Sequence, residues 1–322
     1  MSWLVTGGAG YIGSHIVRAF QAAGITPIVI DDLSSGFERF VPADVPFVKA
    51  SILDTDAVRH ALSEHSCTGV VHLAGFKYAG VSVRRPLHTY EQNVTGTVSL
   101  LSAMQDAGVH NYVFSSSASV YGTPDVDLVT ENTGLKPESP YGQTKLIGEW
   151  LGADMAAVDP AWRFTNLRYF NVVGSGSDDL YDASPHNLFP IVFNALLDGK
   201  TPKIFGDDYP TPDGTCVRDY IHVADLADAH VAAAQNMEEG RELQYAYNLG
   251  SGDGSSVAEI MSAISRVTGI EFEPEHAPRR PGDPARIVAN GDLAARDLGW
   301  QMTHNLDDMV ATAWSAARAN AS

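Results

Sequence analysis

Thr6-Gly7-Gly8-Ala9-Gly10-Tyr11-Ile12-Gly13 is the stretch that decides the fold, because it joins a short apolar run to a helical pattern. Within it, Gly7, Gly10 and Gly13 stand at a G-x-x-G-x-x-G spacing. Glycines there permit a tight turn and let the backbone approach a pyrophosphate, and the helix that follows presents free N–H groups to phosphates. The spacing therefore predicts a dinucleotide-binding turn between a strand and a helix.

An acidic residue supports this interpretation, which matters because a glycine-rich turn alone is also typical of an ordinary loop. Asp31 ends the second apolar run, eighteen residues past Gly13, and Asp32 follows it. A carboxylate at this position accepts hydrogen bonds from the adenosine ribose and repels a 2′-phosphate, so we expect NAD rather than NADP. The alternative is that Asp31 and Asp32 form a solvated turn.

Short apolar runs alternate with helical patterns through the first half of the chain. The helical pattern is seen in Ile12, Ile16 and Phe20, and the candidate strands are Trp3–Thr6, Pro27–Asp31, Pro46–Lys49, Gly69–Leu73, Asn111–Ser115 and Arg163–Leu167. Alternation of this kind predicts an α/β protein with βαβ units in a Rossmann-type, doubly wound parallel sheet that helices cover on both faces.

The pattern loosens after about Tyr169, where residues 174–185 and 209–214 are typical of loops. Helical patterns return at 223–237, 255–268 and 306–318, and a short strand is expected at 245–249. We therefore expect an NAD-binding Rossmann domain made of residues 1–170 plus about 217–249. A smaller C-terminal α/β substrate domain would contain about 171–216 plus 250–322.

Composition excludes several classes of function. The 322 residues include 21 basic and 39 acidic ones, a formal net charge of −18, and a field of that sign repels nucleic acid. Cys67 and Cys216 are too few for a disulfide framework, and no His or Cys spacing suggests a metal site. No apolar run approaches the about 18 residues of a membrane span, and Trp3 leaves no room for a signal segment. We expect a cytoplasmic protein that contacts neither nucleic acid nor membrane.

A second group of residues has side chains suited to acid–base chemistry. Tyr141 and Lys145 are four residues apart at the start of a helical pattern, so both lie on one face. A phenol titrates at about 10, and a fixed ammonium beside it, with the positive nicotinamide ring of an oxidised cofactor, favours the phenolate. Ser117 ends a predicted strand, where open α/β sheets bind ligands. Each residue alone also fits an ordinary helix face or cap.

Together these residues resemble the extended short-chain dehydrogenases/reductases and, within them, the UDP-glucose 4-epimerase family. The resemblance covers nearly the whole chain. Besides the residues above, it rests on the segments Leu73-Ala74-Gly75-Phe76-Lys77, Gln92-Asn93-Val94, Ser115–Gly122, Arg168-Tyr169-Phe170-Asn171, Val217–Val223 and Ala277–Asp283.

The resemblance implies a reaction and roles for the residues that match the family's motifs. Tyr141 would be the catalytic base and acid, Lys145 its tuning partner and ribose anchor, and Ser117 the contact to the substrate hydroxyl. Lys77 would face the nicotinamide. NAD would stay bound while C4 of UDP-galactose or UDP-glucose loses hydride, a 4-keto sugar forms, and hydride returns to its other face.

The resemblance also implies two sets of binding residues. The cofactor would be bound by Gly7, Gly10, Tyr11, Ile12, Gly13, Asp31, Asp32, Ser51, Ile52, Leu73, Ala74, Gly75, Lys77, Asn93, Ser115, Tyr141, Lys145 and Tyr169. The UDP-sugar would be bound by Lys77, Ser117, Tyr141, Phe170, Asn171, Asn187, Leu188, Phe205, Arg218, Tyr220, Arg280, Asp283 and Ile287. Guanidinium groups pair bidentately with phosphate oxygens, which suits Arg218 and Arg280 to a diphosphate, although surface salt bridges are an alternative.

The chain departs from the family's pattern at several positions. Ser51 stands where the family has Asp, Asp32 where Asn is frequent, and the loop of residues 172–185 is shorter than usual. Ile287 occupies the position that sets the width of the sugar pocket in the family. Its stiff apolar side chain predicts a preference for plain hexoses over acetylated ones. The alternative is that Ile287 is a core strand residue.

Other functions and an assembly follow from the same residues. A nucleotide-sugar 4,6-dehydratase would need an acidic pair after Ser117, where Ala118 and Ser119 stand instead. A UDP-N-acetylglucosamine 4-epimerase, a dual-specificity epimerase and a non-enzymatic NAD-sensing regulator remain alternatives. We expect a homodimer built on the helical patterns at 87–107 and 145–157, which are more apolar than one buried stripe requires.

Overall fold

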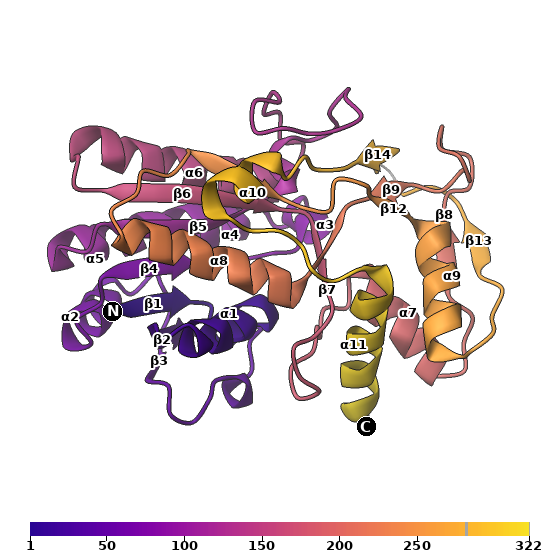
Figure 1. The fold of residues 1–322 in the computed structure, drawn as a ribbon, viewed down its shortest axis with the longest axis horizontal. Helices are drawn as coiled ribbons and strands as arrows, with labels where there is room; N and C mark the ends of the chain where they lie inside the picture. The colour runs from indigo at the N-terminus through magenta and orange to yellow at the C-terminus, as the bar shows by residue number, and fades with distance from the viewer. Residues whose placement is uncertain (281–282, 322) are drawn as a thin grey trace.

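The computed structural model describes residues 1–280 and 283–321. Gly282, which belongs to the segment Ala277–Asp283, therefore lies outside the described residues. A large parallel sheet and a smaller layer of strands and helices lie side by side, and the C-terminal helix belongs to the smaller layer (Figure 1). The large sheet has the order β11-β6-β5-β4-β1-β2-β3, which confirms the predicted doubly wound α/β fold. Its strands are β1 (Ser2–Thr6), β2 (Thr26–Asp31), β3 (Phe47–Lys49), β4 (Gly69–His72), β5 (Asn111–Ser117), β6 (Arg163–Tyr169) and β11 (Ala246–Leu249).

Helices cover both faces of the large sheet because its strands are apolar on both sides. In β1, Trp3 and Val5 point into one core while Leu4 points into the other. The first core is closed by α1 (Tyr11–Ala22), α8 (Val223–Glu238) and α10 (Asp292–Leu298). The second core is closed by α2 (Thr55–Glu64), α5 (Gly96–Ala107) and α6 (Pro140–Val158).

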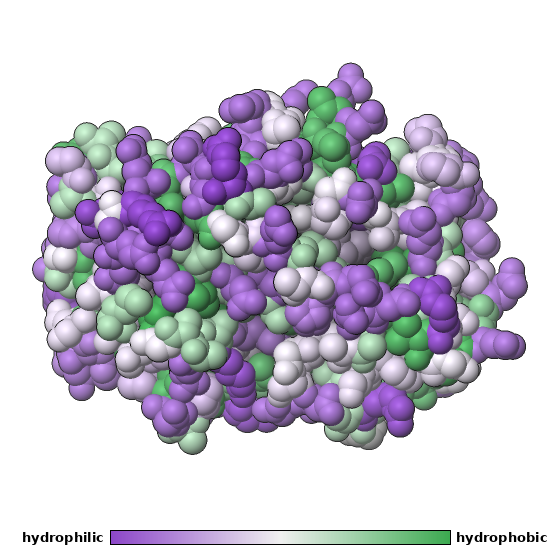
Figure 2. Space-filling view, viewed as in Figure 1, coloured by the Kyte–Doolittle hydropathy of each residue, from purple (hydrophilic) through white to green (hydrophobic). Residues whose placement is uncertain are grey.

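The smaller layer packs around its own apolar core. This core contains Phe189 from α7 (Leu188–Leu197), Ile260 from α9 (Val257–Thr268) and Val310 from α11 (Leu306–Ala319). Short strands complete it: β7 (Asn171–Val173) with β10 (Tyr220–His222), β8 (Lys203–Phe205) with β13 (Glu275–Ala277), and β9 (Val217–Arg218) between β12 (Ser255–Ser256) and β14 (Arg286–Ile287). Hydrophobic residues are dispersed among hydrophilic ones over the face of both layers shown in Figure 2.

The chain crosses between the layers more than once. After β6 it builds β7 and α7 in the smaller layer, and it returns to the large sheet with α8 and β11. Near the C-terminus α10 again packs against the large sheet, where the Trp300 Nε1 donates to the backbone oxygen of Asp225 at 2.7 Å. Residues 292–300 therefore lie with the large sheet, whereas the sequence assigned 250–322 to the smaller unit.

The helical pattern at 87–107 has a local irregularity. The structure places α4 (Pro86–Tyr90), a π-helical turn over Glu91–Thr95 and then α5 there, and α3 (Ala79–Ser82) precedes them. Such π-helical turns widen a helix and are frequent at functional sites. Here the turn carries the buried Asn93 toward the loop that follows β4.

A buried ion pair joins α6 to the large sheet. The Arg168 guanidinium of β6 donates to both carboxylate oxygens of Glu149 in α6, at 2.8 and 2.6 Å, and both side chains are essentially inaccessible. Ser116 of β5 donates to Glu149 at 2.5 Å, and Arg168 donates to the Tyr121 hydroxyl at 2.9 Å. Ser116 and Tyr121 thus complete the hydrogen bonding of the Glu149–Arg168 pair. This matters because an unpaired charge in the interior is very unfavourable.

We expect Glu149→Gln to lower the free energy of unfolding by about 3–5 kcal/mol, because it leaves the Arg168 guanidinium buried without its counter-charge. Urea denaturation measures this change. Glu239→Gln is the matched control, since Glu239 pairs with Arg241 at 2.8 Å on the exposed surface. It should cost less than about 1 kcal/mol. Equal losses in the two variants would contradict this interpretation.

Candidate active site

A large cavity lies between the two layers, at the C-terminal ends of the parallel strands. Its volume is about 1510 Å³. A single small ligand fills roughly 300–1,000 Å³, so this cavity has room for a dinucleotide and a second ligand together. The strand order reverses between β1 and β4, and open α/β sheets bind ligands at such a switch point.

The glycine-rich turn forms one wall of this cavity, and its glycines are required by close packing. A Cβ on Gly13 would lie 2.2 Å from the Gly7 carbonyl oxygen, and one on Gly7 would lie 2.9 Å from the Ala74 nitrogen. Gly7 also has a φ of +72°. No side chain caps α1 at Gly10, so the first N–H groups of the helix are free for an anion.

Asp31 stands beside this turn at the end of β2. Its carboxylate accepts from the backbone N–H of Ala9 at 3.0 Å and from that of Leu33 at 2.8 Å. Burial raises the pKa of Asp31, and these two amide hydrogen bonds oppose the rise. Asp32, Ser51 and Ile52 line the cavity around it. The carboxylate both braces the turn and makes this end of the cavity unfavourable for a further phosphate.

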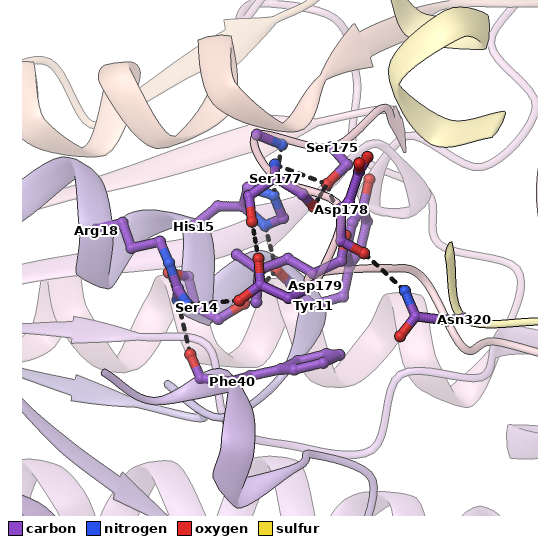
Figure 3. Close-up of polar contacts among 12 residues, drawn as sticks. Tyr11, Ser14, His15, Arg18, Phe40, Ser175, Ser177, Asp178, Asp179 and Asn320 are labelled. Atoms are coloured by element: carbon purple, nitrogen blue, oxygen red, sulfur yellow. Dashed lines mark hydrogen bonds and ion pairs between the residues drawn. The ribbon is translucent and has the colours of Figure 1, made fainter. Parts of the chain in front are cut away.

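The turn is tied to the smaller layer through α1 (Figure 3). The Tyr11 hydroxyl donates to the Gly174 carbonyl at 2.6 Å, and His15 Nε2 accepts from the Gly176 N–H at 2.9 Å. Burial lowers the pKa of His15 to about 4, which keeps the ring neutral and its Nε2 an acceptor. Asn320 next to α11 donates to the Asp178 carbonyl at 2.6 Å. The loop after β7 therefore links α1 to the C-terminal helix α11.

Tyr141, Lys145 and Ser117 meet at the floor of the cavity. Ser139 caps α6 by accepting from the Gly142 N–H at 3.1 Å, and Pro140 begins the helix, so Tyr141 lies in the first turn. Lys145 lies one turn further on and its ammonium donates to the Ser115 carbonyl at 2.7 Å. All three side chains line the cavity together.

Burial dominates the electrostatics of Tyr141. Burial raises the pKa of the Tyr141 phenol, and a hydrogen bond with Ser117 opposes the rise. The Lys145 ammonium lies 5.9 Å from the centre of the Tyr141 ring. Burial lowers the pKa of Lys145 to about 8, and Glu149 in the next turn of α6 opposes that change.

The smaller layer supplies the opposite end of the cavity. The Arg280 guanidinium lies 4.1 Å from the centre of the Phe205 ring, and Arg218 lies 3.8 Å from the Asp283 carboxylate. These two cations and an aromatic face in one wall suit an anion joined to a planar base. Among the described residues, no group of three or more His, Cys, Asp or Glu side chains is arranged to hold a metal ion.

Most of the site residues predicted from the sequence are brought together in this cavity. Those that line it are Gly7, Gly10, Tyr11, Ile12, Gly13, Asp31, Asp32, Ser51, Ile52, Leu73, Ala74, Gly75, Lys77, Ser117, Tyr141, Lys145, Tyr169, Phe170, Asn171, Asn187, Leu188, Phe205, Arg218, Tyr220, Arg280 and Asp283. Asn93, Ser115 and Ile287 are not among the lining residues.

Two of these exceptions support the cavity from behind. The Asn93 amide accepts from the Phe76 N–H at 2.6 Å and donates to the Phe76 carbonyl and to the Thr144 hydroxyl. These bonds occupy most of its hydrogen-bonding capacity, so it clamps the loop after β4 to α6 and does not face a ligand. Ser115 is completely buried beneath Lys145.

The third exception corrects the expected gate of the sugar pocket. Ile287 in β14 packs in an apolar cluster with Val120, Val129 and Leu146. Phe170 packs against the same cluster and itself lines the cavity, so that Ile287 lies in the layer behind. Ile287 therefore does not wall the cavity, and the alternative of a core strand residue fits the structure.

Asp182 is a site residue that sequence reasoning missed. It lines the cavity, and the Asn187 amide donates to its carboxylate at 2.6 Å. Burial raises the pKa of Asp182, while Asn187 and the charge of Lys77 oppose the rise. Nothing in the sequence distinguishes it from the other acidic residues of the loop at 174–185, because only the folded loop turns it inward.

The fold and this site define a class of nucleotide-binding enzyme. The sequence model of the NAD dependent epimerase/dehydratase family matches residues 3–250, and the chain belongs to that family. Among curated relatives it is similar to the UDP-glucose 4-epimerase of Lactobacillus helveticus, with 44% identity covering 98% of this chain and 96% of the relative. The corresponding enzyme of Bacillus subtilis is 42% identical over 98% of this chain and 96% of its own length.

A solved structure extends the similarity to three dimensions. The UDP-glucose-4-epimerase of Stenotrophomonas maltophila, with bound NAD and formylated UDP-arabinopyranose, is 41% identical. It superimposes with a TM-score of 0.94 over 99% of this chain and 98% of that one. The cavity between the layers is therefore part of a fold shared along the full length of a relative.

We expect Gly13→Ala to weaken NAD binding at least about tenfold, because its Cβ would force the turn away from the phosphate position. The rise in melting temperature that NAD produces measures the affinity. Gly134→Ala is the control, since a Cβ there meets nothing within 4 Å. Equal NAD binding by the two variants would show that the close approach is not needed.

Proposed function

We propose that this chain is a UDP-glucose 4-epimerase that interconverts UDP-galactose and UDP-glucose with bound NAD. The observation that carries the proposal is the position of Tyr141, Lys145 and Ser117 in one cavity. The glycine-rich turn closes that cavity at one end, and Arg218 and Arg280 stand at the other. The acid–base residues thus stand between a dinucleotide site and a nucleotide-diphosphate site.

The residues around β1, β2 and β4 fit NAD. When bound, NAD supplies a reversible hydride acceptor for C4 of the sugar. The free N–H groups at the start of α1 would hold its phosphates, and Asp31 would exclude a 2′-phosphate. Lys145 stands in reach of a ribose at the floor of the cavity, and Lys77 lines the same part.

Tyr141 is the group proposed to move the proton at the sugar's C4 hydroxyl. Ser117 accepts from the backbone N–H of Ser119 at 3.2 Å and from its hydroxyl at 3.0 Å, which leaves its own hydrogen for Tyr141. A hydrogen bond donated to the phenol oxygen stabilises the phenolate. Lys145 and the positive charge of an oxidised nicotinamide would add to that stabilisation, and proton transfer by a positioned group typically gives about 10²–10⁴-fold.

Epimerisation requires that the keto-sugar rotate in the site while its UDP group stays bound. Binding energy therefore has to reside on the nucleotide and not on the hexose. Arg218, Arg280, Phe205 and Asp283, which line the cavity on the side of the smaller layer, would hold the UDP portion. We accordingly propose that the large-sheet layer holds NAD and the smaller layer holds UDP.

The experiment is conversion of UDP-galactose to UDP-glucose by purified protein, compared with the N-acetylated pair of sugars. Turnover of the plain pair is expected, together with fluorescence of reduced nicotinamide on adding UDP-sugar. Preferential turnover of the acetylated pair would replace the proposal by a UDP-N-acetylglucosamine 4-epimerase. NAD binding without any turnover would favour the NAD-sensing regulator.

Tyr141→Phe is expected to lower turnover by about 10²–10⁴-fold and to retain NAD, because it removes one oxygen and leaves Lys145 in place. The epimerase assay and the cofactor content of the purified variant measure the two effects. Tyr90→Phe is the control, since the Tyr90 hydroxyl donates to Gln143 at 2.6 Å outside the cavity. Near-normal turnover in Tyr141→Phe would exclude the mechanism.

We also propose a homodimer formed through α4, α5 and α6. Leu87, Val98 and Trp150 on these helices are 84%, 45% and 53% exposed, which is unusual for large apolar side chains.

Val98→Glu combined with Trp150→Glu should convert a dimeric mass to a monomeric one in light scattering, because two buried charges oppose an apolar interface. Val126→Glu, at an exposed position in a loop, should leave the mass unchanged. A monomeric wild-type protein would contradict this proposal.

The cytoplasm is the proposed location. Cys67 and Cys216 are both buried and unpaired, as is usual for thiols in a reducing compartment. None of the helices within residues 1–280 and 283–321 has the length and apolar character needed to cross a membrane.

A further inference from the structure

Two loops from different layers meet beside the glycine-rich turn. One follows β2 of the large sheet and occupies residues 32–40, and the other follows β7 of the smaller layer. We call their contact the clasp, and its side chains are Phe37, Arg39 and Phe40 from the first loop and Tyr181 from the second. The Phe37 and Phe40 rings lie 6.0 and 5.5 Å from the Tyr181 ring, centre to centre. The clasp therefore joins the large-sheet layer to the smaller layer.

The Arg39 side chain holds the three rings together. Its guanidinium donates to the Tyr181 hydroxyl at 2.7 Å. It also lies 4.3, 5.4 and 5.8 Å from the ring centres of Phe37, Phe40 and Tyr181. Cation–π and aromatic contacts of this kind each change an equilibrium by about two- to tenfold. Because Arg39 contacts all three rings, its removal should loosen the whole clasp.

The clasp is fastened to the phosphate-binding end of the cavity. Arg18 of α1 donates to the Phe40 carbonyl at 2.7 Å and pairs with the Asp179 carboxylate of the second loop at 3.4 Å (Figure 3). The Phe37 N–H donates to the Ala9 carbonyl at 2.9 Å, so the first loop lies directly against the glycine-rich turn. The two loops thus meet where the free N–H groups at the start of α1 are suited to phosphates.

The clasp has an inner part and an outer part. Tyr181, together with Ser34 and Ser35 of the first loop, lines the cavity. Arg39 is exposed and is not among the lining residues. A change at Arg39 therefore reaches a ligand in the cavity through Tyr181 and the two loops, and not by direct contact.

We propose that the clasp is the barrier that NAD passes when it enters or leaves the cavity, so that Arg39 and Tyr181 set how long the cofactor is retained. The contacts of the clasp join protein groups only, so they stabilise the closed loops equally with and without NAD. A loosened clasp should therefore accelerate entry and exit by the same factor and leave the affinity unchanged. Long retention suits the proposed function, because hydride taken from C4 has to return to the same sugar from the same NAD.

Arg39→Ala tests this inference, because it removes the contacts to the rings without removing a group that lines the cavity. Displacement of bound etheno-NAD, a fluorescent analogue, by excess NAD measures the dissociation rate. Titration of protein freed of cofactor with the analogue gives Kd, and rapid mixing gives the association rate. We expect both rate constants to rise at least about tenfold, while Kd changes by less than about twofold.

Two further variants identify the part played by Arg39. Arg59→Ala makes the same substitution on α2, where the guanidinium pairs with Asp56 at 2.6 Å near the surface, and it should leave both rate constants unchanged. Arg39→Lys keeps a cation beside the rings and should raise the rate constants less than Arg39→Ala does.

A double-mutant cycle tests whether Arg39 acts through Tyr181. In the Tyr181→Ala background, Arg39→Ala should change the dissociation rate by less than about twofold, because the ring that Arg39 holds is already gone. Independent, multiplying effects of the two substitutions would overturn this role of Tyr181.

The rate constants of Arg39→Ala decide the inference. Unchanged rate constants would overturn it, and so would faster dissociation with unchanged association, since that result makes Arg39 a contributor to affinity and not to a barrier. The inference needs NAD binding but not epimerase activity. A wild-type protein that binds NAD and turns over no UDP-sugar would contradict the proposed function alone, and the exchange of NAD would still decide the role of the clasp.

Discussion

The buried pair of Glu149 and Arg168 is the interaction on which the geometry of the site depends. It joins α6, which carries Tyr141 and Lys145, to β6, which ends at Tyr169. Ser116 of β5 donates to the same carboxylate. Because an incompletely satisfied pair would be strongly destabilising, these elements keep one relative position. The chemistry of the site is thus held by charges that never contact a ligand.

Buried neutral histidines also fix hydrogen bonds around the site. His15 and His230 are each buried, each with Nδ1 bound to a carbonyl four residues earlier in its helix. Each ring therefore offers Nε2 as an acceptor, to the Gly176 N–H in one case and to the Ser115 hydroxyl in the other. Desolvation removes the charged state, and the helix carbonyl selects the tautomer. Burial and a helix carbonyl together therefore give these hydrogen bonds a defined direction.

Periodicity and glycine spacing sufficed to predict the sheet from the sequence. The strands expected at 3–6, 27–31, 69–73 and 111–115 match β1, β2, β4 and β5 to within two residues at each end. Their apolar runs have no polar face, which only a sheet covered on both sides can bury. Gly13 was equally informative, because a Cβ is excluded wherever α1 approaches β1 so closely.

The sequence by itself determined the βαβ order, the glycine-rich turn and the spacing of Tyr141 and Lys145 on one helix face, since these depend on local spacing. Only the tertiary structure decided which side chains face the cavity: it turned Asp182 inward, and it placed Asn93 and Ile287 behind the lining. It also raised the pKa of Tyr141, because desolvation depends on everything packed around the phenol. Local sequence patterns specify the helices and strands. Contacts between residues far apart in the chain decide which way each side chain faces and how deeply it is buried.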